Sequence, residues 1–316
     1  MKAINFINAK MNKKDIAMPS FLYKYRPFDK FTYDMLENGY VYLCPAKNLD
    51  DPSECKVDFS VQDFYDLKSN RLTLKGIDMI LEFVRPHTTE KNFQLVRSIV
   101  ARTLMWDGSV RRNLLLDSWS EIQELVPGID TAPLINWLGT IPERMNDPQL
   151  RFKFIALFSL AHDARRDMGI CSLSELKNCD RMWNDYAGNS SGYCIEYDLR
   201  EYENINLLFP VVYQDNRENN IVTSILGSFI GEMIYGISYG QAVVDKSQYI
   251  RLFLTKDTIW DYQREWRLIG DANQKLPAPK ISAIYLGNCI SEQEKQNIIE
   301  YCLVHKIKVV SAQSKR

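Results

Sequence analysis

A block of helix-periodic sequence interrupts a strand-rich chain, and this interruption limits the possible fold more than any other feature. Between residues 60 and 165, apolar residues recur at spacings of three to four, which is typical of helices that bury one face. Turn-forming residues divide the block into helix-sized segments at Arg85-Pro86, Pro127-Gly128 and Ile141-Pro142. The periodicity therefore predicts several short helices that pack against one another.

Short runs rich in β-branched and aromatic residues lie on both sides of this block and indicate strands. No Gly/Ser-rich linker separates the runs from the helical block. We therefore predict an α+β protein that forms a single domain over residues 1–316, with a strand-rich core at about 20–58 and 168–312 and a helical insertion at about 60–165. The predicted strands are 20–26, 40–44, 169–175, 192–199, 209–215, 265–270, 283–287 and 306–312.

Five helices are predicted outside the block, and one of them carries Trp183 and Tyr186. A short helix between the first two strands ends at Asn38-Gly39, a typical C-cap. Two more are predicted near 220–236 and near 244–256. The last begins at Ser291, and Glu294 follows three residues later, which is the spacing of a capping box.

Balanced charge argues against some partners. The chain has 39 basic and 40 acidic residues and a net charge of −1, so we expect no long-range attraction to nucleic acid or to an anionic membrane. The most apolar stretch, 220–240, contains Glu232 and four glycines, and its uninterrupted apolar part is short. A buried helix is therefore favoured over a membrane span.

The cysteines and histidines suggest no metal site. There are seven cysteines and three histidines, no CxxC pair occurs, and the spacing of Cys171 and Cys179 fits no common zinc site. The N-terminal segment shows no secretory signal. We therefore expect reduced thiols, no metal and a cytoplasmic location.

The segment DYQREWRLIG (261–270) raises the main functional question. Its bulky apolar residues predict a strand, and Gln263, Glu265 and Arg267 are two residues apart, so they are expected to share one face. This polar row is either a solvated outer face, on which Glu265 and Arg267 form an ion pair, or the floor of an active site.

Five motifs stand in order along the chain and together carry a resemblance. They resemble those of an uncharacterised prokaryotic domain family over about residues 20–310. Two positions depart from its pattern, because Asp50 replaces an asparagine and Gln263 replaces a glutamate. The motifs are LYKYRP (22–27), DDPSE (50–54), CSLSELKNCDRMWNDYAGNSSGYCIEYDL (171–199), WDYQREWRL (260–268) and AIYLG (283–287).

Residues within these motifs also resemble, more distantly, the Arg–Ser–Glu form of the ADP-ribosyltransferase superfamily. The chain offers Arg26 on its first predicted core strand, Ser172 and Ser174 on a later strand, and Gln263 and Glu265 on a further one. The resemblance implies an ADP-ribosyltransferase-like core of antiparallel strands, and it implies NAD as the substrate.

The resemblance also implies roles for the residues at the reacting bond and at the phosphates. Glu265 would stabilise the oxocarbenium-like transition state of NAD cleavage, and Gln263 would orient the acceptor. Arg26, beside Tyr25, would grip the pyrophosphate, because a guanidinium binds phosphate oxygens in pairs.

The serines and two aromatic residues would complete the site. One hydroxyl of Ser172 and Ser174 would bind the ribose and the other would brace Glu265. Trp183 and Tyr186, three residues apart on a predicted helix, would form a flat wall for the nicotinamide ring. We expect Arg26, Ser172 and Glu265 to line a single pocket.

Simpler alternatives stand beside these roles. Arg26 is equally an exposed arginine at a strand end, and the two serines equally belong to a solvent face or a turn. Trp183 and Tyr186 are more often core than cofactor wall. Asp51 and Glu54 follow a proline-bearing turn, where capping is favoured over metal binding.

The expected function is transfer of ADP-ribose from NAD to an unknown macromolecular acceptor, protein or nucleic acid, or hydrolysis of NAD. Prokaryotic enzymes of this kind often act as toxins or phage-defence effectors. One alternative is a non-catalytic module that binds a nucleotide or a protein. A second is a nucleic-acid-processing enzyme on the same core, which would need a basic groove beside Arg26. No membrane partner is expected, and the sequence leaves the oligomeric state open.

Overall fold

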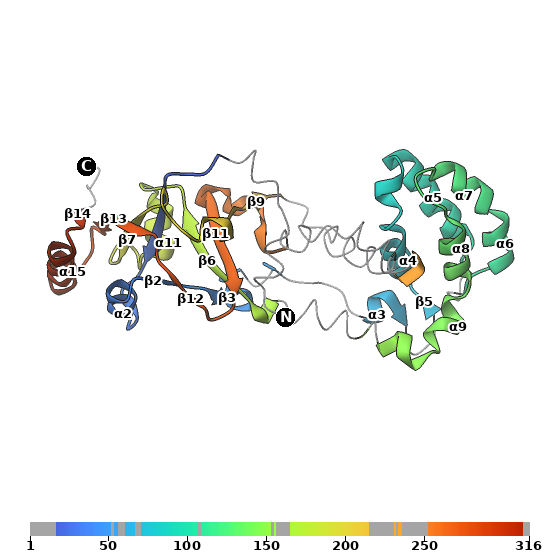
Figure 1. Ribbon diagram of the computed structural model, residues 1–316, viewed down its shortest axis with the longest axis horizontal. Coiled ribbons are helices and arrows are strands. Elements are labelled where there is room, and N and C mark those ends of the chain that lie inside the picture. Colours follow the sequence, from blue (N-terminus) through green and yellow to red (C-terminus); the bar gives the residue numbers. More distant parts are fainter. Residues whose placement is uncertain are drawn as a thin grey trace. The chain divides into compact units, whose positions relative to one another are not determined.

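The chain folds into two compact units, which are described separately. In the computed structural model, the first unit comprises Met1–Cys55, Arg165–Arg217 and Phe253–Arg316, and the second comprises Lys56–Ala164 and Glu218–Leu252. We call them the sheet unit and the helical unit (Figure 1). The structure describes residues 17–51, 54–55, 61–66, 71–105, 109–152, 155, 165–214, 231, 233–235 and 252–311.

The sheet unit is built on one eight-stranded sheet with the order β14-β13-β7-β1-β6-β11-β8, and the eighth strand, β3, pairs with β6. Figure 1 shows β7, β6 and β11 within this unit. Six predicted strands lie in this sheet close to their expected positions. The eight strands of the sheet are β1 (Phe21–Arg26), β3 (Cys44–Pro45), β6 (Met168–Ser174), β7 (Tyr193–Asp198), β8 (Leu208–Pro210), β11 (Glu265–Asp271), β13 (Lys280–Leu286) and β14 (Lys308–Ser311).

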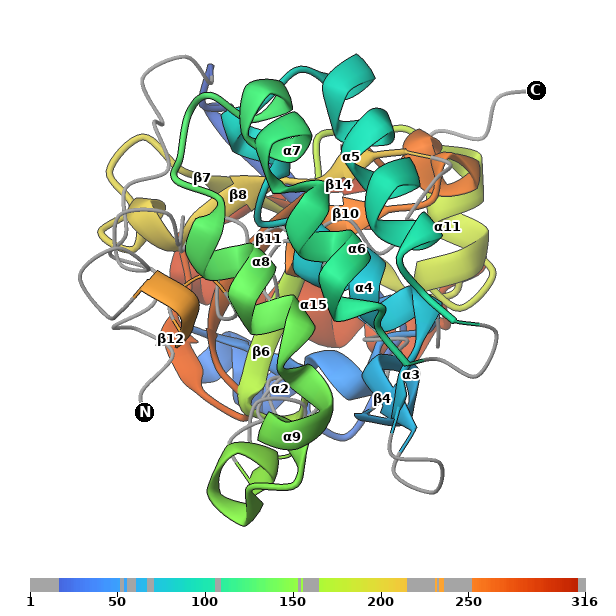
Figure 2. The same cartoon turned by 90° about the vertical axis from the view of Figure 1, so that its right-hand side faces the viewer.

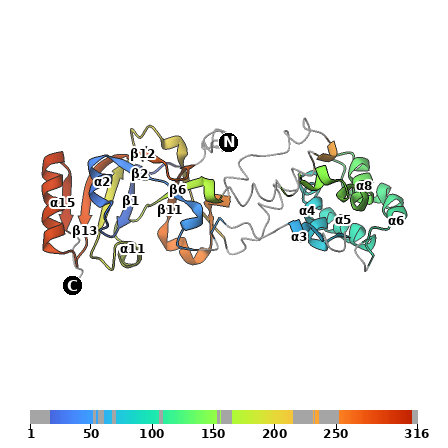
Figure 3. The same cartoon turned by 90° about the horizontal axis from the view of Figure 1, so that it is seen from below.

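The α+β class is confirmed, but the sheet is mixed rather than wholly antiparallel. β14 pairs with β13 in parallel, whereas the other neighbours in the sheet run antiparallel. The reason is the helix α15 (Glu292–His305), which links the two strands, lies beside them (Figure 3) and returns the chain in the same direction. The predicted start of this helix is confirmed, because Ser291 Oγ accepts a hydrogen bond from the backbone N–H of Glu294 at 3.2 Å.

The centre of the sheet is buried on both faces. All residues of β11 except Asp271, and all residues of β6 except Ser172, are buried. Polar side chains on these two strands therefore lie in the interior, where they need partners. This burial is the structural origin of the site described below.

Smaller elements surround the sheet. The predicted helix near 244–256 differs from the structure at its end, because β10 (Thr255–Lys256) is a strand that pairs in parallel with β9 (Val212–Tyr213). Residues 252–254 of that segment are helical, whereas 244–251 lie outside the described residues, as does most of the predicted helix near 220–236. The other elements are α2 (Thr32–Glu37), β2 (Tyr40–Tyr42), η2 (Ala46–Asn48), α11 (Asp180–Tyr186), η4 (Ile205–Leu207), η5 (Thr258–Gln263) and β12 (Lys275–Pro277).

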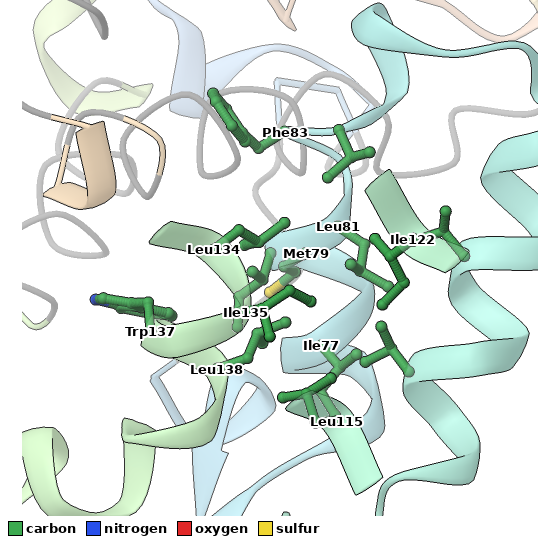
Figure 4. Close-up of a cluster of buried hydrophobic side chains, with 14 of the residues drawn as sticks. Ile77, Met79, Leu81, Phe83, Leu115, Ile122, Leu134, Ile135, Trp137 and Leu138 are labelled. Carbon is green, nitrogen blue, oxygen red and sulfur yellow. The ribbon is translucent and has the colours of Figure 1, made fainter. Parts of the chain in front are cut away.

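The helical unit has a hydrophobic core of its own. Within it, α5 packs beside α7 and α6 beside α8 (Figure 2). Figure 4 shows apolar side chains of α4, α6, α7 and α8 gathered into one cluster, as the sequence periodicity predicts. The described elements are α3 (Val61–Phe64), β4 (Tyr65–Asp66), β5 (Arg71–Leu72), α4 (Leu74–Leu81), η3 (Arg85–His87), α5 (Glu90–Arg102), α6 (Arg112–Asp117), α7 (Trp119–Leu125), α8 (Ala132–Gly139) and α9 (Ile141–Met145).

Within the described ranges, no helix has both the length and the apolar character that crossing a bilayer requires. The apolar stretch 220–240, for which a buried helix is predicted, falls largely outside those ranges.

Substitution of one core leucine tests the packing of the helical unit. Leu134 is 0% exposed, so Leu134→Ala removes contacts on all sides and leaves a cavity. We expect the free energy of unfolding of this unit to fall by about 2–5 kcal/mol. Urea unfolding followed by far-UV circular dichroism measures the change.

The matched control is Leu74→Ala, because Leu74 is 68% exposed at the start of α4. Its unfolding curve should remain close to that of the wild type. Equal destabilisation by the two substitutions would contradict the assigned core.

Candidate functional site

A pocket of about 220 Å³ opens on the sheet unit. Its walls come from β1, β6 and β11, from the turn that follows η2, and from β10 and η5. The lining combines aromatic rings with charged side chains, a mixture typical of ligand sites rather than of a packing defect. The polar residues that matter below are Lys24, Glu54, Ser172, Ser174, Lys256, Gln263, Glu265 and Arg267.

The pocket lies where the sheet is least completely paired. β1 pairs with β7 over its whole length, but its pairing with β6 is confined to Tyr23 and Ser174. The ammonium of Lys24 donates a hydrogen bond to the backbone carbonyl of Ser172 at 2.7 Å. A side chain therefore satisfies a carbonyl that a regular ladder would have paired with backbone.

Cross-strand register decides which side chains face the pocket. Tyr23 lies directly opposite Ser174, and Ser174 lies directly opposite Glu265. Ser172 and Arg267 form the next opposed pair. Because directly opposed residues share a face, these side chains project to the same side of the sheet.

Four buried charged residues form the floor of the pocket, and we call them the charge quartet. Arg267 is 0% exposed, Glu54 1%, Glu265 4% and Lys256 7%. Two come from β11, one from β10 and one from the turn after η2. Burial of any one of them alone would be strongly unfavourable, so their mutual pairing is a condition of the fold.

Arg267 connects the two carboxylates of the quartet. Its Nε donates to Glu265 Oε1 at 2.7 Å, and its Nη2 donates to Glu54 Oε2 at 2.6 Å and to Glu265 Oε2 at 3.2 Å. Its Nη1 donates to the backbone carbonyl of Phe253 at 2.7 Å. The guanidinium thus uses its planar set of donors almost completely.

Lys256 makes a second connection between the same carboxylates. Its Nζ donates to Glu265 Oε2 at 2.9 Å and to Gln263 Oε1 at 2.8 Å. It also lies 2.9 Å from Glu54 Oε1, an ion pair whose angles are not those of a hydrogen bond. Two cations and two carboxylates therefore balance one another inside the sheet unit.

This arrangement keeps Glu265 ionised. Burial alone would raise the pKa of its carboxyl, but the charges of Arg267 and Lys256, with hydrogen bonds from Arg267 and Ser172, lower the pKa to about 2. The two carboxylates in turn raise the pKa of the buried Arg267 guanidinium. Glu265 is accordingly an anion at every physiological pH.

Gln263 differs from its predicted position. It belongs to η5 rather than to the strand, because Arg264 adopts a left-handed conformation with φ of 40° and turns the chain. Its side chain nevertheless reaches the pocket, where Nε2 donates to Tyr186 Oη at 2.6 Å. The expected row of three residues on one strand face is thus reduced to Glu265 and Arg267.

The two serines have different surroundings. Ser172 is half-buried on the same face of the sheet as Glu265, and its hydroxyl contributes to the lowered pKa of that carboxyl. Ser174 is buried, and its hydroxyl donates to the backbone carbonyl of Gln263 at 2.6 Å and accepts from the N–H of Leu176 at 3.0 Å. Ser174 therefore holds the turn that carries Gln263.

The aromatic residues separate into lining and core. Tyr25 and Tyr186 line the pocket. The single O–H of Tyr25 is shared between the backbone carbonyls of Leu176 and Lys177, whose oxygens lie 2.9 and 2.7 Å from the hydroxyl oxygen. Trp183 is absent from the described lining and packs edge-on against Tyr25, with ring centroids 5.2 Å apart. The position of Trp183 corresponds to the core alternative rather than to a cofactor wall.

Arg26 does not line this pocket. It is three residues from Tyr23 on β1, so it projects to the opposite face of the sheet. There its Nη2 donates to Asp29 Oδ2 at 2.7 Å and its Nη1 to Met35 Sδ at 3.2 Å. The expectation that Arg26, Ser172 and Glu265 share one pocket is therefore not met.

Arg26 instead lines a second hollow of about 300 Å³. This hollow adjoins the pocket, because some residues line both. Lys24 is the cation among them. The shared lining residues are Lys24, Tyr25, Cys44, Ile170 and Tyr186.

Sequence reasoning missed several charged residues of the pocket, among them Glu54, Lys24 and Lys256. Glu54 stands in the DDPSE motif, which offered a signal, but its turn suggested a capping role. Lys24 alternates with the aromatic residues of β1, and Lys256 stands in no motif. Their positions depend on contacts between distant segments, which periodicity does not report. In the described parts of the chain, no cluster of His, Cys, Asp and Glu is arranged to hold a metal ion.

Removal of one cation from the quartet tests its energetic weight. Arg267→Met leaves two buried carboxylates with Lys256 alone, so we expect the free energy of unfolding to fall by about 3–5 kcal/mol. Urea unfolding measures the change. Arg200→Met is the matched control, because Arg200 forms an exposed ion pair with Asp198 and its loss should shift the midpoint little. Similar losses for both variants would contradict the assigned role of the quartet.

The depressed pKa of Glu265 predicts a dependence of stability on pH. Because its pKa falls from 4.5 to about 2 on folding, the stabilisation is complete above about pH 4.5 and is lost as the pH falls towards 2. We expect the difference in unfolding free energy between wild type and Glu265→Gln to shrink over that range. Urea unfolding at a series of pH values measures it. A difference that stays constant with pH would show that the carboxylate charge is not the cause.

The comparisons with known proteins give one match, which covers part of the chain and carries no activity. The sequence profile of a family described as a protein of unknown function (DUF2971) matches residues 182–268. No curated protein and no solved structure matches the chain. The matched stretch contains Lys256, Gln263, Glu265 and Arg267 of the pocket, whereas Glu54 precedes it. The predicted resemblance to an uncharacterised family is thus supported over residues 182–268, the stretch that carries three members of the charge quartet.

Proposed function

We propose that the pocket is the active site of an enzyme that cleaves NAD and transfers ADP-ribose to a macromolecule or to water. The observation that carries the proposal is the position of Glu265. Its carboxylate has a lowered pKa, is held by buried cations and lines a pocket beside Ser172 and Gln263. A fixed negative charge at the base of a small pocket suits a reaction in which positive charge develops.

The reaction breaks the bond between the nicotinamide nitrogen and the ribose anomeric carbon. The electron pair of that bond leaves with nicotinamide, and the ribose approaches an oxocarbenium ion, as in glycoside hydrolysis. The acceptor then forms a bond to the anomeric carbon and gives up its proton. Glu265 stabilises the charge of the ribose without itself forming a bond.

The neighbours of Glu265 divide the remaining tasks. Ser172 braces the carboxylate, and the ring of Tyr186 forms part of the wall against which a nicotinamide ring can lie. Gln263 is neutral and is held between Lys256 and Tyr186, so it orients groups without adding a second anion. Among the described residues, the buried Nε1 of Trp260 has no hydrogen-bond acceptor, and this donor is available to a ligand in the pocket.

The rest of the dinucleotide requires the adjoining hollow. A pocket of about 220 Å³ is small for a ligand of this size, since such sites usually measure about 300–1,000 Å³. Lys24 lines both hollows, so it is the cation that a pyrophosphate extending from one to the other would meet. Arg26 lines only the second hollow, and its proposed phosphate role requires the ligand to reach that hollow. A cytoplasmic toxin or phage-defence effector is the biological role in keeping with this activity.

One observation favours a second candidate, a non-catalytic module that binds a nucleotide. Both oxygens of Glu265 already accept hydrogen bonds from cations of the quartet. A carboxylate held in this way can serve the pocket as a rigid structural element. The module would bind NAD or a related nucleotide and leave it intact.

Nicotinamide release from labelled NAD tests the proposal and separates the candidates. We expect turnover by the wild type and a loss of about 100-fold or more in Glu265→Gln, because one well-placed charge is removed. Ser172→Ala provides a second variant that leaves the quartet intact. Glu300→Gln is the matched control, since Glu300 is exposed on α15.

Thermal shift with NAD completes the test. Stabilisation without nicotinamide release would support the binding module. Wild-type release that Glu265→Gln does not diminish would contradict the proposed role of Glu265. Neither release nor a thermal shift would overturn both candidates.

A further inference from the structure

Glu54 is the member of the quartet that lies outside the matched residues 182–268, and the sequence predicted no role for it in the site. It lies 213 residues before Arg267 in the sequence and is 1% exposed. Its contacts mirror those of Glu265, because one carboxylate oxygen pairs with Arg267 and the other lies 2.9 Å from Lys256. The site therefore contains two carboxylates in nearly equivalent positions relative to the same two cations.

We propose that Glu54 is a positioning residue that keeps the floor of the pocket electrically neutral, so that the site favours a ligand whose reacting group becomes positively charged. This inference rests on the proposed function and names a property of the same site. Glu54 pairs with the same two cations as Glu265, so their two positive charges are not balanced by Glu265 alone. It acts through the quartet and has no assigned contact with the reacting atoms.

The net charge of the quartet depends on Glu54. With Glu54 present, Arg267 and Lys256 face two carboxylates and the net charge of the quartet is zero. Without Glu54, the same cations face one carboxylate and the quartet carries a net positive charge at the base of the pocket, which Asp50, Asp51 and Lys24 also line. That charge would repel an oxocarbenium-like transition state, and repulsion is strong where water is excluded.

The repulsion acts mainly on the transition state. The reacting ribose gains its positive charge only as the bond breaks, so the turnover rate should change more than the Michaelis constant. For unit charges several ångströms apart near a protein surface, the Coulomb energy corresponds to a rate decrease of about 10- to 100-fold. A residue that only stabilised the fold would not lower kcat while leaving KM almost unchanged.

The decisive experiment compares Glu54→Gln with Glu54→Gln/Lys256→Met. The single variant leaves a net positive floor, whereas the double variant removes one acid and one base and restores neutrality. We expect kcat for nicotinamide release to fall about 10- to 100-fold in Glu54→Gln with a smaller change in KM, and to recover substantially in the double variant. Glu300→Gln serves as the control for loss of an exposed carboxylate.

Two results would overturn the inference. One is a wild-type kcat in Glu54→Gln, and the other is a double variant that is folded but no more active than the single variant. If Glu54→Gln does not fold, the double variant is compared directly with the wild type, and a folded but inactive double variant overturns the inference as well.

Failure of the proposed function is distinguishable from failure of this inference. If the wild type releases no nicotinamide, the proposed function falls, and melting temperatures then decide the role of Glu54. A melting temperature that falls in Glu54→Gln and recovers in the double variant supports charge balance. A further fall in the double variant overturns it.

Discussion

Two arginine–carboxylate and two lysine–carboxylate ion pairs in the interior are the constraint on which the sheet unit depends. A charged group buried without a partner is strongly disfavoured, so Arg267 can lie at the centre of β11 only if Glu54 and Glu265 accompany it. Lys256 is needed as well, because Arg267 alone would leave one of the two buried carboxylates without a balancing cation. The pairing therefore brings together the turn after η2, β10 and β11, and the pocket is the space that these segments enclose with β1 and β6.

The regular elements were largely predictable because they depend on local periodicity. Short runs rich in β-branched and aromatic residues indicated β1, β6, β7, β11, β13 and β14, and spacings of three to four indicated the helices of the helical unit. The parallel pairing of β14 was not predicted, since it depends on the path of α15 rather than on either strand. The start of β11 was also not predicted, because Gln263 was expected on the strand and lies in η5 instead. An arginine in a left-handed conformation has no distinctive sequence signal, because glycine and asparagine usually occupy that region.

The candidate site was predictable in part. Side chains alternate between the two faces of a strand, and this alternation separates the residues that line the pocket from those that do not. Ser172 and Glu265 were placed on facing strands and do line one pocket. Arg26 was assigned by its motif, but strand alternation directs it to the other face from Tyr23. Glu54 and Lys256 could not be placed, because an ion pair between residues about two hundred positions apart leaves no periodic trace. Trp183 belongs to the core around Tyr25, as large aromatic residues usually do.

The full-length pairing of β1 with β7 sets the chemical character of the pocket wall. Six opposed residue pairs fix this register, and Tyr23 and Tyr25 consequently face the charge quartet while Lys24 and Arg26 alternate with them. A slip of a single residue would exchange the two sets and present a basic wall in place of an aromatic one. Hydrogen bonds between the backbones of β1 and β7 thus determine how much ring surface the cleft offers, beside Lys24, to whatever enters it.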